Sequence, residues 1–267
     1  MATKSPSPLG EGRGEGDFVA SIARGFSILR SFRRGERSLG NKEISDRTGL
    51  PRSSVARITA TLTQLGYLEF LPSQEKYALG VGVLGLGQNY LAGLDVREVA
   101  RPLMQELAGD TRATVALAAR DADQMVFLEI CHGSQLFGLR LGVGERVPRG
   151  TTALGRAAHA GLPAAERKRV LDAVRKGAKG AHRELLIKGL EQAVKDYERH
   201  GFCLSLGDWE RNVHGVGVPM ASSDGVRVLA FSCFGPPHDM TRARLVGEVG
   251  PRLTVLRDRV RESLGGF

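Results

Sequence analysis

The stretch Asn41–Leu65, NKEISDRTGLPRSSVARITATLTQL, decides the fold of the first part of this chain. It predicts two short amphipathic helices, with Ile44 facing inward on the first. Gly49 lies where a helix C-terminus favours positive φ, and Pro51 suits a first helical turn because its missing N–H costs nothing there. One face of the second helix is apolar, through Val55, Ile58, Leu62 and Leu65. The pattern therefore predicts a helix-turn-helix; the alternative is an ordinary pair of surface helices whose polar side faces water.

The other face of the second helix is small, polar and basic. Such side chains fit the major groove of duplex DNA, where Arg57 is the best candidate for a bidentate contact with guanine. From Arg24 to Arg57 the chain has nine Lys or Arg against three Asp or Glu, which favours a polyanionic partner. The residues predicted to contact DNA are Arg24, Lys42, Arg52, Ser53, Ser54, Arg57, Thr61 and Lys76.

The flanking segments complete a winged helix-turn-helix. Residues 67–80, YLEFLPSQEKYALG, predict two short strands around a turn, from which Lys76 can touch backbone phosphate. Upstream, a third helix is predicted to pack under the motif through Ile22, Phe26, Leu29 and Phe32. We expect the DNA-binding domain at residues 18–79. Residues 1–17 are rich in Gly, Pro and Ser and predict a flexible arm that is more simply an inert tail than a DNA contact.

The composition is that of a soluble globular protein. A length of 267 residues suffices for two domains, and the net charge of +9 is by itself only weak evidence for nucleic acid. Three cysteines without a CxxC pair argue against a disulfide framework or a zinc ribbon and fit a reduced cytoplasm. No apolar run approaches the roughly 20 residues of a membrane span, and no signal-peptide core is present. We expect a cytoplasmic protein without a metal centre or membrane association.

A literal G-x-G-x-x-G pattern occurs at Gly80, Gly82 and Gly85. A dinucleotide-binding turn needs a buried strand directly before it and a βαβ unit around it, whereas here a short hairpin precedes it. We therefore favour a linker helix at residues 80–94 over a cofactor site. The leucines of this segment recur at helical spacing, and we expect them to pack against a second subunit.

Residues 95–267 predict a second domain of grouped strands and helices. Asp95–Gly109 has an apolar stripe and predicts a helix that ends at Gly109, while residues 144–152 predict a loop. This order of elements predicts an α+β domain, with helices largely on one face of a sheet and a pocket between the sheet and its loops. The other predicted helices are 153–161, 164–176, 185–200 and 242–264, the last kinked at Gly250-Pro251, and the predicted strands are 114–119, 124–131, 136–143, 202–206, 213–219 and 226–234.

Together these motifs resemble the IclR family of bacterial transcriptional regulators, over nearly all of Ser21–Leu264. In the first half, the pattern S-x-A-R-G-x-x-I-L-x-x-F spans Ser21–Phe32, and E-I-x-x-x-T-G-L-P-x-S-x-V spans Glu43–Val55. In the second half, P-x-x-x-T-A-x-G-K-A appears at Pro148–Ala157, with Arg156 where the family usually has Lys. R-x-G-F follows at residues 199–202 and F-S-C-F-G-P at residues 231–236.

The resemblance implies a winged helix-turn-helix followed by a GAF-like domain that binds small, often carboxylated metabolites. It also implies dimers, or dimers of dimers, on pseudo-palindromic operators in double-stranded DNA, and no cofactor. Asp208 matches an acidic position of the family, although Asn212-Val213 replaces the Gly-Val pair that usually follows it. Asn adopts left-handed geometry more readily than most residues, so the turn can survive this exchange.

Strand alternation and loop placement predict which residues line the effector pocket. The turn at Thr152–Leu154 opens a helix, so its free backbone N–H groups and the Thr152 hydroxyl can hold a carboxylate. Phe234 favours an aromatic acid, and ordinary core packing is an equal alternative for the aliphatic members. The predicted effector-binding residues are Leu139, Leu141, Val143, Thr152, Ala153, Leu154, Ser205, Asp208, Gly215, Ser232 and Phe234.

No motif of an enzyme is present: the chain lacks H-E-x-x-H, a G-x-S-x-G elbow and a Walker motif. His214 near Cys203 or Cys233 is at most a chance metal cluster. The sequence therefore predicts a ligand-responsive, sequence-specific DNA-binding regulator that senses a small, aromatic organic acid. The alternatives are a small-molecule-processing enzyme domain fused to a DNA-binding module and a scaffold that binds only another protein.

Overall fold

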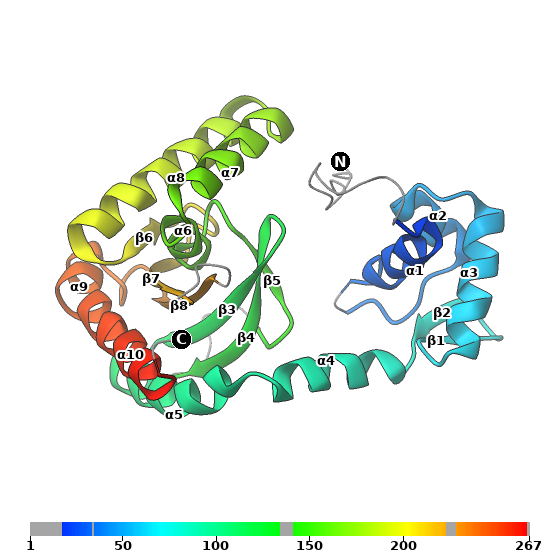
Figure 1. Ribbon diagram of the computed structural model, residues 1–267, viewed down its shortest axis with the longest axis horizontal. Coiled ribbons are helices and arrows are strands. Elements are labelled where there is room, and N and C mark those ends of the chain that lie inside the picture. Colours follow the sequence, from blue (N-terminus) through cyan, green and yellow to red (C-terminus); the bar gives the residue numbers. More distant parts are fainter. Residues whose placement is uncertain (1–17, 34, 134–140, 223–227, 266–267) are drawn as a thin grey trace. The chain divides into compact units, whose positions relative to one another are not determined.

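The computed structural model describes residues 18–33, 35–133, 141–222 and 228–265 (Figure 1). The chain divides into two compact units, Met1–Gly93 and Leu94–Phe267. In the described ranges, no helix combines the length and the apolar character needed to cross a membrane.

The first unit is a winged helix-turn-helix. Ile28, Leu39, Ile44 and Val55 are almost fully buried in its core, and Gly49 ends the second helix at φ 71°. The wing is an antiparallel hairpin in which Leu68 pairs with Leu79 and Leu71 with Lys76. The elements are α1 (Ala20–Arg30), α2 (Asn41–Thr48), α3 (Arg52–Gln64), β1 (Leu68–Leu71) and β2 (Lys76–Leu79).

Two predicted packing faces of this unit are wrong in part. In α1 the inward residue is Ile28, whereas Ile22 and Phe26 are 59% and 54% exposed. Leu65, which follows the last residue of α3, is exposed, and Thr59 is buried in the stripe, where its hydroxyl donates to the carbonyl oxygen of Val55 at 3.0 Å. A hydroxyl that bonds within its own helix can enter a core, which the apolar spacing alone does not reveal.

The glycines of the G-x-G-x-x-G pattern serve backbone packing. A Cβ at Gly80 or Gly82 would overlap the carbonyl oxygen of Gly66, which accepts a hydrogen bond from the N–H of Gly82 at 3.2 Å. The segment then continues as helix α4 (Gly82–Ala92), which has no buried residue. Close approach of two backbone segments therefore accounts for Gly80 and Gly82 without a nucleotide.

The second unit is built on a six-stranded antiparallel sheet with the order β5-β4-β3-β8-β7-β6. Its strands are β3 (Thr114–Asp121), β4 (Gln124–His132), β5 (Arg146–Pro148), β6 (Cys203–Leu206), β7 (His214–Ala221) and β8 (Val228–Gly235). Strand β5 lies inside the segment predicted as a loop, because three residues are too few to show a strand pattern. Of the predicted strand 136–143, residues 136–140 lie outside the described residues, and Leu141–Val143 form no strand.

Helices cover both faces of this sheet, which corrects the prediction of helices largely on one face. Val216 pairs with Cys233, whose Sγ lies 3.8 Å from Thr111 Oγ1 of α5, while the neighbouring Gly217 faces α6. Adjacent strand residues point to opposite faces, so α5 and α6 lie on different sides. The helices are α5 (Asp95–Thr111), α6 (Ala153–Ala160), α7 (Ala164–Gly177), α8 (Gly180–His200), α9 (Arg242–Arg244) and α10 (Gly250–Ser263), with a π-helical turn, η1 (Leu245–Val249), before α10.

The π turn lies where the sequence predicts a kink. The N–H of Gly250 bonds to the carbonyl oxygen of Leu245, five residues back, and Pro251 follows at the start of α10. Proline cannot donate to the preceding turn, so the helix accommodates it by a local change of winding.

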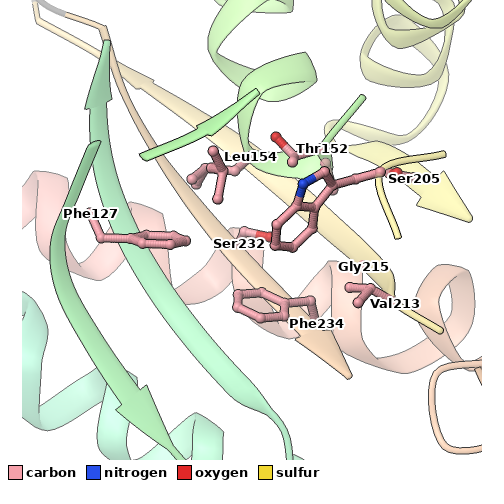
Figure 2. Close-up of a pocket in the computed structure, with 11 residues that line it drawn as sticks. Phe127, Thr152, Leu154, Ser205, Val213, Gly215, Ser232 and Phe234 are labelled. Carbon is pink, nitrogen blue, oxygen red and sulfur yellow. The ribbon is translucent and has the colours of Figure 1, made fainter. Parts of the chain in front are cut away.

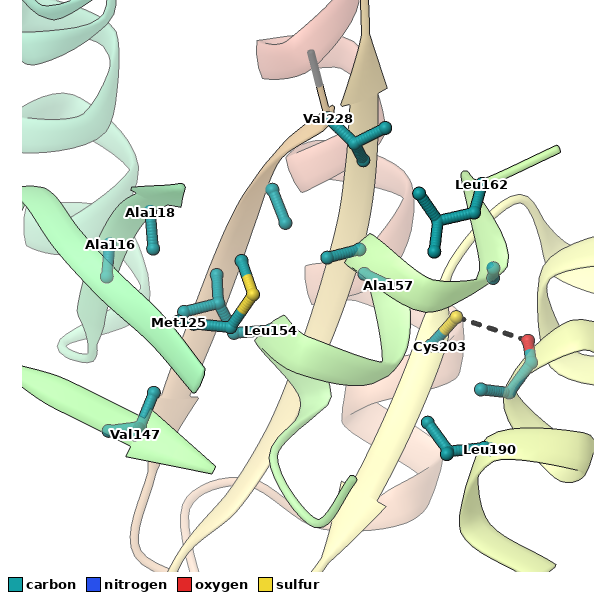
Figure 3. Packing of buried hydrophobic residues seen from close by; sticks show 14 of the residues in the cluster. Ala116, Ala118, Met125, Val147, Leu154, Ala157, Leu162, Leu190, Cys203 and Val228 are labelled. Atoms are coloured by element: carbon teal, nitrogen blue, oxygen red, sulfur yellow. Dashed lines mark hydrogen bonds between the residues drawn. The ribbon is translucent and has the colours of Figure 1, made fainter. Parts of the chain in front are cut away.

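Two glycines make room for helix α6, Gly217 toward the sheet and Gly155 toward the turn before the helix. All eight of its residues are buried, among them Leu154 and Ala157 of the core in Figure 3. A Cβ at Gly217 of β7 would overlap the carbonyl oxygen of Ala153, and one at Gly155 would overlap the backbone of Arg149. The N-terminus of α6 is thereby pressed against the sheet.

We predict that Gly217→Ala destabilises the second unit by about 1–3 kcal/mol, since the new methyl group overpacks the α6–β7 contact. Gly247→Ala is the matched control: a Cβ at Gly247 meets no heavy atom within 4 Å. It should be neutral or slightly stabilising. Denaturant unfolding followed by the fluorescence of Trp209, the one tryptophan of the chain, measures both. Equal stability of the two variants would contradict the close-approach argument.

Candidate effector pocket and DNA-binding surface

A pocket lies between the sheet and the N-terminus of α6 (Figure 2). Its walls come from β4, β5, β6, β7 and β8, from the start of α6 and from the loop between β6 and β7. The empty space between them, open mouth included, is about 370 Å³. The lining residues are Phe127, Val147, Thr152, Ala153, Leu154, Ser205, Trp209, Val213, Gly215, Ser232 and Phe234, and none of these described residues is charged.

Seven residues predicted for the pocket are brought together here: Thr152, Ala153, Leu154, Ser205, Gly215, Ser232 and Phe234. Leu139 lies outside the described residues. Leu141 packs against the core beside the pocket, Val143 is 39% exposed in a turn, and Asp208 points to Arg156; none of these three lines the pocket. Their prediction rested on a strand over residues 136–143, which is not formed at 141–143, and on a family position.

Four lining residues were missed. Phe127 faces the pocket because a bulge at the Leu117/Ala118 position of the β3–β4 register resets the alternation of β4. Val147 lies on the short β5, and Trp209 and Val213 lie on the loop between β6 and β7. The single tryptophan of the chain, close to a predicted pocket segment, was the one available signal.

The hydroxyl groups of the pocket donate to the protein itself. Thr152 donates to the carbonyl oxygen of Pro148 at 2.7 Å and accepts from the N–H of Gly155 at 3.1 Å, so it caps α6. Ser205 donates to the carbonyl oxygen of Thr151 at 2.6 Å, and Ser232 to that of Val216 at 2.9 Å. The Thr152 hydroxyl is therefore not a free donor for a carboxylate, which corrects that part of the prediction.

The N–H groups of Ala153 and Leu154 remain as donors. They belong to the first two residues of α6, which have no acceptor within the helix, and both residues line the pocket. The positive end of the helix dipole adds to their attraction for an anion.

Arg156 fixes the segments on which the pocket is built. Only 6% exposed, it donates to the carbonyl oxygens of Gly150 at 3.2 Å and Leu204 at 2.9 Å, and it pairs with Asp208 at 2.7 Å. Gly150 precedes α6, Leu204 adjoins Ser205, and Asp208 adjoins Trp209. Its fork of donors therefore joins three chain segments, a role suited to arginine in place of lysine.

The predicted DNA-binding surface centres on α3, whose Arg52, Ser53, Arg57 and Thr61 are exposed and whose Ser54 is half-buried. Arg24 of α1 and Lys42 of α2 are also exposed. Arg24, Lys42, Arg52 and Arg57 form no ion pair with any residue that the structure describes. These charges are available to phosphate or base edges.

Other polar groups of this unit are already engaged. Lys76 pairs with Glu43 at 3.1 Å, so a phosphate contact would have to displace that carboxylate, and Thr61 donates to the carbonyl oxygen of Arg57 at 3.0 Å. Arg47 binds both oxygens of Glu36, at 2.5 and 2.8 Å. Hydrogen bonding from Arg47 lowers the pKa of Glu36 to about 2, so this pair joins α2 to the preceding loop at neutral pH.

His214 and the cysteines Cys203 and Cys233, which the sequence left as a chance metal cluster at most, each have other partners. His214 Nδ1 lies 3.1 Å from the carbonyl oxygen of Met240, and Cys203 Sγ donates to the carbonyl oxygen of Ala193 at 3.2 Å. Among the described residues, no three His, Cys, Asp or Glu side chains gather in a way that would hold a metal ion.

Comparison with known proteins decides the family. A model of the IclR helix-turn-helix domain matches residues 21–72, and a model of the bacterial transcriptional regulator IclR C-terminal domain matches residues 88–256. The chain belongs to the IclR family. The HTH-type transcriptional regulator TsaQ1/TsaQ2 of Comamonas testosteroni is 35% identical over 257 residues, which are 95% of this chain and 91% of that protein.

Solved structures of IclR proteins have the same architecture. That of an IclR family transcriptional regulator from Brucella abortus is 39% identical, with a TM-score of 0.86 over 96% of this chain and 97% of that chain. An IclR homolog from Microbacterium hydrocarbonoxydans, solved in complex with 4-hydroxybenzoate, is 22% identical, with a TM-score of 0.72 over 92% of this chain and all of that chain. At 22% identity, this second likeness concerns the fold alone.

These findings confirm the predicted fold class, a winged helix-turn-helix with a C-terminal α/β domain of the IclR type. They also make this IclR protein a DNA-binding transcriptional regulator and not an enzyme, because its relatives are transcriptional regulators.

One buried histidine of α6 has no bonding partner. His159 is fully buried, and neither ring nitrogen has a hydrogen-bond partner among the described residues. Desolvation, together with the nearby positive charges of Arg149 and Arg167, lowers its pKa from 6.5 to about 4. His159 is therefore a neutral core residue at physiological pH.

We predict that His159 makes the second unit acid-sensitive. As pH falls from 6.5 to 4, the unfolded chain binds a proton that the folded chain excludes, so stability present above pH 6.5 is lost, by up to about 3 kcal/mol. His159→Phe should lose less stability over this window. Denaturant unfolding at several pH values, followed by Trp209 fluorescence, tests this, and parallel pH profiles of the two proteins would contradict it.

Proposed function

We propose that this IclR-family regulator binds a small aromatic carboxylate in the pocket of its second unit, and that this ligand changes how a dimer binds a pseudo-palindromic operator. A ligand shifts such an equilibrium only through different affinities for the DNA-competent and DNA-incompetent arrangements. The observation that carries the proposal is the composition of the pocket, in which an apolar wall meets the first residues of α6, Ala153 and Leu154, whose N–H groups have no acceptor within the helix.

The wall favours an aromatic ring. Phe127 and Phe234 extend from β4 and β8, and Leu154 approaches from α6 (Figure 2). Flat apolar surfaces of this kind bury a ring and offer edge or offset contacts to it. An aliphatic acid of the same length would bury less surface against the two phenyl groups.

The polar groups favour one carboxylate and tolerate one hydroxyl. The N–H groups of Ala153 and Leu154 can hold a carboxylate, and no side-chain cation among the described lining residues competes for it. Ser205 and Ser232 use their protons on backbone carbonyls, so they retain only acceptor capacity. A ligand hydroxyl can donate to such an acceptor. The 4-hydroxybenzoate bound by the Microbacterium hydrocarbonoxydans homolog has these two polar ends.

The operator-binding part of the proposal rests on α3. Its exposed Ser53 and Arg57 lie on the side opposite the buried Val55 and Leu62, as a recognition helix requires. The wing residue Lys76 would add a phosphate contact in place of its pairing with Glu43.

The dimer part of the proposal rests on apolar surface that the chain leaves uncovered. In α1, Ile22 and Phe26 are more than half exposed, and in α4 Leu84 and Tyr90 are 60% and 56% exposed. Exposed apolar residues in this number on two helices are typical of an association surface. We propose a second copy of the chain as the occupant, since IclR regulators on two half-sites require a symmetric assembly.

Replacing Ala153 with proline tests the carboxylate site, because proline at the first helical position removes one N–H and keeps the helix. Thr152 already has extended backbone angles, φ −90° and ψ 149°, which a following proline requires. We expect 4-hydroxybenzoate to bind about tenfold or more weakly, as for a lost hydrogen bond to a charged group of about 2 kcal/mol. Binding of phenol, which has no carboxylate, should change little.

The matched control is Ala164→Pro at the first position of α7, away from the pocket. Calorimetric titration measures both ligands on both variants. An equal loss of phenol and 4-hydroxybenzoate affinity in Ala153→Pro would indicate a distorted pocket, and unchanged affinities for both would contradict the carboxylate site.

Replacing Arg57 with alanine tests the recognition helix. We expect a loss of about 1–3 kcal/mol at one base position of a selected operator and little change on scrambled duplex. Lys76→Ala should instead weaken binding to all sequences alike and reduce the salt dependence. Electrophoretic or fluorescence titration at fixed salt measures both, and full retention of sequence discrimination by the Arg57 variant would count against its role.

Replacing Leu84 with glutamate tests the proposed dimer surface. The charge should weaken self-association at least tenfold, because a buried leucine contributes about 1.5–3 kcal/mol that the carboxylate forfeits. Val255→Glu is the control, since Val255 of α10 is 57% exposed and lies in the other unit. Sedimentation equilibrium gives the association constants. A Leu84 variant as strongly associated as the Val255 variant would place the interface elsewhere.

A further inference from the structure

A second concavity of the C-terminal unit shares no lining residue with the effector pocket. It lies along one face of α8 and includes side chains from α6 and from the loop after β6. Its empty space, open mouth included, is about 780 Å³. The lining residues of this groove are Arg156, Leu185, Lys188, Gly189, Glu191, Gln192, Lys195 and Asp208.

The groove has unbalanced positive charge. Lys188, Gln192 and Lys195 follow one another at helical spacing, so two ammonium groups and an amide line the same side. Both acids of the groove are already paired: Glu191 lies 3.9 Å from Arg175, and Asp208 lies 2.7 Å from Arg156. Lys188 and Lys195 form no ion pair with a described residue.

The groove also contains a buried guanidinium group with spare donors. Nε and Nη1 of Arg156 bond to the carbonyl oxygens of Gly150 and Leu204, whereas Nη2 donates no hydrogen bond to a described residue. Gly189 of α8 leaves the space for it, because a Cβ at that position would overlap Nη2. Arg156 is only 6% exposed, so the position of this group is set by its surroundings.

We propose that this groove is a second, anion-binding site, which takes a small ligand with two or more negative charges, a phosphate or a di- or tricarboxylate. Arg156 Nη2 provides directed N–H donors, and Lys188 and Lys195 provide charge from α8. A multivalent anion is favoured over a monovalent one because three cations line the groove and only one of them, Arg156, has a carboxylate partner there.

Occupation of the groove has a direct route to the effector pocket. An anion at Nη2 of Arg156 brings negative charge beside Asp208, which pairs with Nη1 of the same guanidinium group, and Trp209, the next residue, lines the effector pocket. Repulsion of the Asp208 carboxylate would therefore alter the loop that carries Trp209. The two sites would then be linked through one arginine, and a general metabolic anion would adjust the response to the specific effector.

The test is calorimetric titration of the full-length protein with inorganic phosphate and, separately, with citrate, at constant ionic strength. We expect saturable binding of at least one of them, and the pair identifies whether phosphate or carboxylate chemistry is preferred. Lys188→Gln/Lys195→Gln should weaken it roughly tenfold, because two exposed cation–anion contacts are lost. Lys168→Gln/Lys176→Gln on α7 removes the same charge outside the groove and should leave binding unchanged.

Absence of saturable binding of both anions, or equal weakening in both double variants, would overturn the site. The emission of Trp209 should change with the same midpoint as the heat, and an unchanged emission at saturation would overturn the link to the effector pocket. Neither measurement uses an effector or DNA, so the result stands apart from the outcome of the effector and operator experiments.

Discussion

The second unit depends on the distance at which a helix can lie on a sheet. Gly217 on β7 has no side chain, so the first turn of α6 approaches this strand more closely than a methyl group would allow. Every residue of this helix is buried. The first turn of α6, whose N–H groups have no acceptor within the helix, lines the pocket beside the strands.

The close packing of α6 also affects the charged groups of the unit. It buries a guanidinium group, that of Arg156, and an imidazole ring, that of His159, on one helix of eight residues. The surroundings of these two groups differ. The guanidinium group of Arg156 is paired with two carbonyl oxygens and Asp208. His159 has no such partner, and burial lowers its pKa to about 4. Protein interiors tolerate a charge only where hydrogen bonds replace lost water, and both outcomes occur here within one turn of helix.

Much of the fold follows from local signals that agree with one another. Gly49, Pro51 and the stripe of α3 predict the helix-turn-helix, and Thr152 correctly marks the start of α6. The errors arise where a pattern has two solutions. In α1 apolar residues occupy both faces, so spacing alone does not tell that Ile28 is inside and Ile22 outside. All eight residues of β8 are buried, as expected for a strand that is covered on both faces of the sheet.

The lining residues on a regular strand or at the helix start were predictable from the sequence, and those that depend on a bulge or a loop were not. Strand alternation on β8 and the helix start at residue 152 place most of the predicted residues on the pocket wall. Phe127 depends on a bulge, and Trp209 and Val213 depend on a loop; neither feature follows from a period of 2 or 3.6. The partner of Asp208 could not be predicted either, since an ion pair between segments 52 residues apart is a property of the tertiary fold.

The pocket is lined both by main-chain N–H groups and by side chains, and these two kinds of group respond differently to mutation. Backbone N–H groups at the head of α6 survive any substitution except proline, while the surrounding wall is assembled from residues on several separate strands and loops. If the pocket binds a carboxylate as proposed, mutation can reshape that wall one position at a time without erasing affinity for acids. A lineage built on this scaffold could then change its effector through single exchanges, and gene duplicates could diverge in specificity before either copy loses its response.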